Sequence, residues 1–136
     1  MAVEFFGNLS HPKAIVIRSG EKVIGIQFFS PEDYSQQIGL MTRPQGYIVP
    51  AHFHNEVKRV ITSTQEVLIV RKGECMITLF GSSGQAQERI ILSCGDVVLL
   101  AHGAHKIEML TECEILEIKQ GPYAGEFDKT LIKVDL

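Results

Sequence analysis

The chain lacks the features that mark a nucleic-acid-binding, membrane or secreted protein. Its 13 basic and 16 acidic residues leave a net charge of −3, whereas a nucleic-acid binder normally carries a basic patch. No apolar run approaches the length of a membrane span, and residues 1–6 have neither the basic start nor the long apolar stretch of a signal peptide. We therefore expect a cytoplasmic protein with no nucleic-acid partner and no membrane partner.

Cysteine is also scarce. Cys75, Cys94 and Cys113 are an odd number of thiols and show no C-x-x-C spacing. In a reducing compartment such residues are expected to be free. Cys75 and Cys113 lie in strand-like runs and should pack as small apolar side chains, with a catalytic thiol as the alternative.

The 136 residues suffice for one hydrophobic core, so residues 1–136 are taken as a single domain. Short runs of aliphatic and β-branched residues dominate, and turn residues bound each of them. This pattern predicts an all-β sandwich or barrel, with at most one helical turn at 31–37, where Ser30 would be the cap. The predicted strands are 14–18, 23–29, 37–42, 66–71, 74–80, 88–92, 96–100, 105–110 and 114–119.

Histidine and glutamate supply the most informative pattern. His52 and His54 are two residues apart, and in a strand such residues point to the same face. Glu66 follows twelve residues later, and His105 lies far down the chain. Three imidazoles and one carboxylate suit one divalent transition metal, which could be Fe, Mn, Ni, Cu or Zn.

The two later ligand candidates lie on strand faces that are otherwise apolar. Glu66 shares its face with Leu68 and Val70, and His105 shares its face with Ile107 and Met109. A lone polar group on an inward face would be costly to bury. A bound metal is the simplest partner that would offset this cost.

These residues resemble the two sequence motifs of the cupin superfamily, and the likeness covers about residues 46–109. The resemblance implies a small single-domain cupin-like β-barrel, also described as a double-stranded β-helix or jelly roll. It also implies that His52, His54, Glu66 and His105 are metal ligands. The first motif is matched by Gly46, His52, His54, Glu66 and Gly73, and the second by Gly95, Gly103 and His105.

The chain departs from the family pattern at three places. Eleven residues separate His54 from Glu66 where the family has three or four, so 55–65 should form a lid or an interface hairpin. Ala101 replaces the proline of the second motif, and one residue is missing before the last histidine. His102 therefore competes with His105 as the fourth ligand, and we favour His105 because it opens an apolar-alternating run.

The resemblance implies a metal-dependent enzyme that acts on a small-molecule metabolite by dioxygenase, isomerase or lyase chemistry. The alternatives are a non-catalytic module that binds a small ligand or sugar, and a metal-free sugar-nucleotide isomerase or epimerase. Glu117 and Lys119 either face the cavity or are exposed, and the sequence leaves both possibilities open. We also expect a homodimer, because barrels of this type expose edge strands that can pair between chains.

Overall fold

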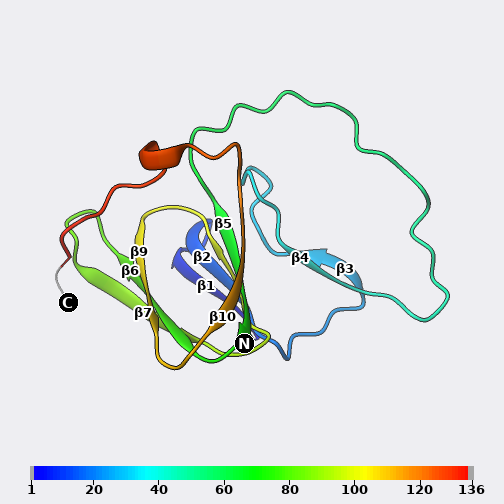
Figure 1. Cartoon of the computed structure of the whole chain (residues 1–136). Helices are drawn as coiled ribbons and strands as arrows, with labels where there is room; N and C mark the ends of the chain where they lie inside the picture. Colours follow the sequence, from blue (N-terminus) through cyan, green and yellow to red (C-terminus); the bar gives the residue numbers. More distant parts are fainter. Residues whose placement is uncertain (1, 135–136) are drawn as a thin grey trace.

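The computed structural model describes residues 2–134, which form ten strands and one short 3-10 helix (Figure 1). The all-β prediction is confirmed, and all nine predicted strands are present with ends shifted by three residues or fewer. The first strand was not predicted, and 31–37 forms turns in place of a helical turn. The elements are β1 (Val3–Asn8), β2 (His11–Ile17), β3 (Gly25–Phe28), β4 (Gly39–Thr42), β5 (Glu66–Lys72), β6 (Cys75–Phe80), β7 (Ala86–Leu92), β8 (Val97–Leu100), β9 (Ala104–Met109), β10 (Glu114–Lys119) and η1 (Gly125–Phe127).

The strands form three antiparallel sheets. The largest has the order β1-β2-β8-β5-β10, a second has the order β7-β6-β9, and β3 pairs with β4 alone. Gly73, with φ +85°, makes the tight connection between β5 and β6, which belong to different sheets. A left-handed backbone conformation of this kind favours glycine.

The main core lies between the five-stranded and the three-stranded sheet. Alternate residues of facing strands point into it, as the period of two in the sequence requires. Leu68 and Val70 of β5 are 3% and 1% exposed, so their predicted inward direction is confirmed. The buried members of this core are Ala14, Val16, Leu68, Val70, Cys75, Ile77, Leu79, Ile90, Leu92, Val98 and Leu100.

The outer face of the five-stranded sheet is covered at one end only. Tyr34 and Ile38, from the turns between β3 and β4, pack there with Ile15 and Leu99. The Tyr34 hydroxyl donates a hydrogen bond to the carbonyl oxygen of Pro12, which ties this cover to β2. At the β10 end the same face remains open, because Leu116 and Ile118 are 44% and 48% exposed.

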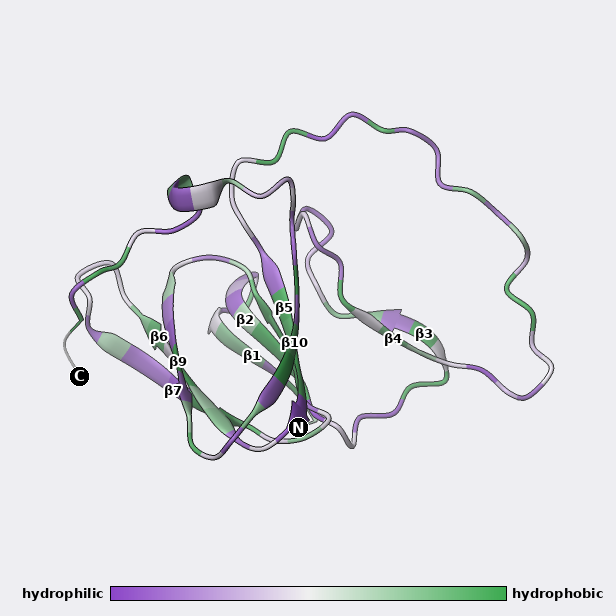
Figure 2. Ribbon diagram, viewed as in Figure 1, coloured by the Kyte–Doolittle hydropathy of each residue, from purple (hydrophilic) through white to green (hydrophobic). Residues whose placement is uncertain are grey.

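Residues 43–64, here called the arm, leave the sheets altogether. The arm forms a wide loop that contains no strand, and each of its residues is exposed (Figures 1 and 2). The argument that His52 and His54 point to the same face requires a strand at these residues, and this structure has none there. Within residues 2–134, no sheet closes into a barrel, and β9 and β10 are edge strands. Among residues 2–134 there is no helix long and apolar enough to cross a membrane.

Candidate functional site

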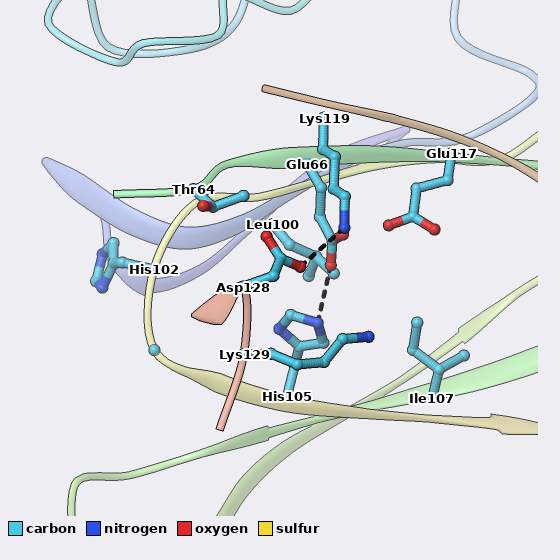
Figure 3. A pocket seen from close by; sticks show the side chains of 11 residues that line it. Thr64, Glu66, Leu100, His102, His105, Ile107, Glu117, Lys119, Asp128 and Lys129 are labelled. Atoms are coloured by element: carbon cyan, nitrogen blue, oxygen red, sulfur yellow. Dashed lines mark hydrogen bonds and ion pairs between the residues drawn. The ribbon is translucent and has the colours of Figure 1, made fainter. Parts of the chain in front are cut away.

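A cavity of about 330 Å3 opens between the two main sheets, at the side where β9 and β10 are edge strands. β5 and β10 form one wall and β9 forms the opposite wall (Figure 3). This volume is at the lower end of the range for small-molecule sites. The lining residues are Thr64, Glu66, Leu100, His102, Gly103, His105, Ile107, Glu117, Lys119, Asp128 and Lys129.

Glu66 and His105 meet across this cavity (Figure 3). Glu66 begins β5 and points to the same side as the buried Leu68, and His105 stands two residues before Ile107 on β9. Glu66 Oε1 lies 2.9 Å from His105 Nε2, with side chains 15% and 31% exposed. Two of the groups that the sequence singled out, from strands distant along the chain, thus face each other.

The electrostatics of the pair favour an ionised Glu66. The hydrogen bond from His105 is the main reason that the pKa of Glu66 falls from 4.5 to about 2, and burial opposes this change. Glu117 moves in the other direction, because its hydrogen bond with Glu66 raises the pKa of its own carboxyl group. The cavity therefore holds one strongly acidic and one weakly acidic glutamate side by side.

Lys119 completes the charged wall. It stands opposite Glu66 in the β10–β5 ladder, and its Nζ lies 3.0 Å from Asp128 Oδ2. This ion pair raises the pKa of Lys119. The sequence left open whether Glu117 and Lys119 face the cavity, and the structure shows that both do.

His52 and His54 lie far from this constellation along the arm. Their rings are 5.3 Å apart, and His52 Nδ1 lies 2.7 Å from the carbonyl oxygen of Pro50. Neither residue lines the cavity that contains Glu66 and His105. The structure thus brings two of the four predicted ligands together, and in the described part of the chain no three His, Cys, Asp or Glu residues form a group suited to a metal.

His102, the competitor of His105, occupies a turn at the rim of the cavity. Its Nε2 lies 3.0 Å from the carbonyl oxygen of His11, and its ring stacks on that of His11 with centroids 5.0 Å apart. His105 alone of the two contacts Glu66. The geometry therefore favours His105 as the partner of Glu66.

Asp128 and Lys129 are cavity residues that the sequence reasoning missed. They follow η1 and lie in a segment without a strand pattern. Spacing and alternation give no signal in such a segment, so only the folded chain reveals its position over the cavity. Asp128 is held there by its ion pair with Lys119.

Comparison of the chain with protein-family models, curated proteins and solved structures gives no match in any of the three. The chemistry of the cavity itself indicates what the protein can do. Carboxylate, imidazole and ammonium groups converge on one polar space with apolar Leu100 and Ile107 beside them. Such a set can bind a small polar molecule, hold a proton at Glu117, and offer two donors to a cation.

Proposed function

We propose that the protein is a metal-dependent enzyme that acts on a small polar molecule in the cavity between β5, β9 and β10. The observation that carries this proposal is the 2.9 Å approach of Glu66 and His105. Carboxylate and imidazole groups are donors that first-row transition metals accept, so Fe, Mn, Ni, Cu and Zn remain the candidates. On the sequence grounds given above, we assign this activity to the cytoplasm.

We infer further that the active form has a cupin-like jelly roll, in which His52 and His54 join Glu66 and His105 as ligands. The free edges of β9 and β10 beside the cavity support this inference, since an added strand there would enclose it. A metal bound by these residues would supply Lewis-acid activation of a substrate oxygen.

The remaining cavity residues would bind and orient the substrate. Glu117, with its raised pKa, can hold a proton beside the reacting molecule and exchange it during catalysis. Lys119 offers a positive charge to an anionic substrate group, and its ion pair with Asp128 directs the ammonium group toward the cavity. Leu100 and Ile107 limit the entry of water.

Metal analysis of the freshly purified protein tests this proposal. Wild type should carry about one ion per chain, and Glu66→Gln and His105→Ala should lose it. Glu117→Gln is the matched control, because it removes a carboxylate of the same cavity that is not a proposed ligand. Full metal content in both His52→Ala and Glu66→Gln would contradict the assignment. Activity against a metabolite panel, measured with and without chelator, then tests catalysis.

A second candidate is a metal-free isomerase or epimerase. It is favoured by one observation, namely that Glu66 contacts His105 at 2.9 Å and also raises the pKa of Glu117 in the same cavity, so three titratable groups interact there. Such a set resembles the proton-transfer groups of general acid–base catalysis. Turnover that survives complete metal removal would favour this candidate, whereas ligand binding without turnover would favour a non-catalytic module.

A further inference from the structure

The arm leaves the protein with far more exposed surface than its size explains. The accessible surface is 9677 Å2, whereas a compact monomer of 15.1 kDa exposes about 7,100 Å2, so the excess is about 2,600 Å2. Much of the exposed surface is apolar. The large apolar side chains exposed on β3, β4 and the arm include Ile26, Phe28, Met41, Ile48, Phe53, Val57 and Val60.

The C-terminal end of the arm is firmly held at Gln65, here called the base. The Gln65 backbone N–H donates to Gln120 Oε1 at 2.6 Å, and Gln65 Oε1 accepts from the Gln36 backbone N–H at 3.0 Å. Gln65 is buried, and Glu66 of the cavity follows it directly. The arm therefore ends at the rim of the cavity that contains Glu66, although its own His52 and His54 do not line this cavity.

The edge of β9 is the complementary surface. A strand that pairs with β9 places alternate side chains on the face of His105 and Ile107, about 5 Å from their neighbours between Cβ atoms. His52 and His54 have the required spacing of two residues. Docking would also pair the backbone of the arm, which makes no backbone–backbone hydrogen bond from residue 48 to residue 64 in the described chain.

We propose that two copies of this chain exchange their arms, so that His52 and His54 of each copy complete the Glu66–His105 site of the other. The edge strand β9 is unpaired, and the arm that could pair with it extends away from the sheets. A chain of this form is one half of a dimer whose copies exchange their arms. If each copy covers its excess surface, the pair buries about 5,000 Å2, at the upper end of the range for obligate homodimers.

The position of the base fits a two-fold arrangement. The arm leaves beside Glu66 and would enter beside His105 of the second copy, so the donating and receiving surfaces adjoin on one face of each copy. Adjoining surfaces of this kind are what an isologous pair needs. The ligand assignment within this inference rests on the metal site proposed above, whereas the exchange itself rests on surface and backbone pairing.

Light scattering tests the assembly without any metal. Wild type at micromolar concentration should have twice the chain mass of 15.1 kDa. Val60→Asp, which places a charge on an 83% exposed apolar position of the arm, should shift it toward monomer. Leu9→Asp is the matched control, because Leu9 is 78% exposed outside the arm, and it should remain dimeric. A monomeric wild type would overturn the proposal.

A paramagnetic label tests the exchange directly. One chain carries the label on Phe53→Cys, in a background with Cys94 and Cys113 replaced, and the other chain is isotope-labelled for NMR. In the mixed dimer the label should broaden the amide signals of β9 in the isotope-labelled chain. A dimer in which these signals stay sharp would overturn the exchange, whatever the metal content.

Complementation then tests the shared site. The arm variant His52→Ala/His54→Ala and the body variant Glu66→Gln/His105→Ala should each bind no Ni²⁺ after dialysis. Their mixed dimer should bind one ion per two chains, half the content of wild type. A mixed dimer that stays empty while wild type binds Ni²⁺ would mean that each arm closes on its own body. If wild type binds no Ni²⁺ but the broadening of β9 is present, the metal proposal fails and the exchange stands.

Discussion

The Glu66–His105 pair should stabilise the fold in addition to any role in binding. In metal-free protein at pH 7, we expect His105→Ala to lower the free energy of unfolding by about 2 kcal/mol, since hydrogen bonds to charged groups contribute about 1.5–3 kcal/mol. The substitution leaves the carboxylate of Glu66, only 15% exposed, without its main partner. The pKa of Glu66 should rise as a result, because His105 is the largest cause of its depression.

The pKa sets an upper limit to this effect. A carboxyl group whose pKa falls from 4.5 to about 2 on folding adds at most about 3 kcal/mol to the free energy of unfolding at pH 7. The raised pKa of Glu117 opposes part of it, and solvent at the 31% exposed His105 weakens the pair further. Because the pKa is lowered on folding, the stabilisation is fully present above pH 4.5 and is lost as the pH falls toward 2.

Urea unfolding at pH 7 and pH 3 measures this prediction. The difference between wild type and His105→Ala should be about 2 kcal/mol at pH 7 and clearly smaller at pH 3. His102→Ala is the matched control, because it removes an imidazole at the same cavity that does not contact Glu66. Equal stability of His105→Ala and wild type at pH 7, or a difference that grows toward acid, would refute the reasoning.

Three further predictions follow from other parts of the structure. Thr78→Val should raise the free energy of unfolding by about 1 kcal/mol in urea titration, because the buried Thr78 hydroxyl has no hydrogen-bond partner in the described chain; a loss of stability would count against this reading. Arg18→Met should lower the free energy of unfolding by about 2 kcal/mol at pH 7, because Arg18 forms ion pairs with Glu4 and with the buried Asp96. The pKa of Glu4 is lowered by Arg18, so this loss should shrink as the pH falls below about 4.5, and a pH-independent loss would contradict it. The preferred metal at a hundredfold excess over its Kd should raise the melting temperature of wild type by about 10 °C, and Glu66→Gln should show no such rise in calorimetry.

Much of the strand arrangement was open to prediction from the sequence. Apolar alternation between turn residues is a local signal, and it located β5, β6 and β10 to within one residue. The same alternation pointed Leu68 and Val70 inward, and the structure buries both. β1 (Val3–Asn8) escaped prediction, since its short run of mixed residues gains its strand character from pairing with β2.

The arm shows why a local pattern can fail. Residues 46–54 carry apolar and β-branched residues typical of a strand, yet in this structure they have no neighbouring strand to pair with. A strand exists through hydrogen bonds to its neighbours, and no residue pattern supplies these by itself. A strand at His52 and His54 thus depends on a partner surface, which we propose is β9 of a second copy.

The sequence by itself determined the fold class and two of the groups that meet in the cavity. Its period of two placed Leu68 and Val70 of β5 inward, because successive side chains of a strand must alternate. The same rule failed at the end of β9, where Met109, predicted on the inward face with His105, is 54% exposed. Only the tertiary structure decided that Glu117 and Lys119 join Glu66, since strand order and register set which residues lie opposite each other. It also decided where Asp128 lies, because an ion pair with Lys119 joins segments whose proximity no local pattern encodes.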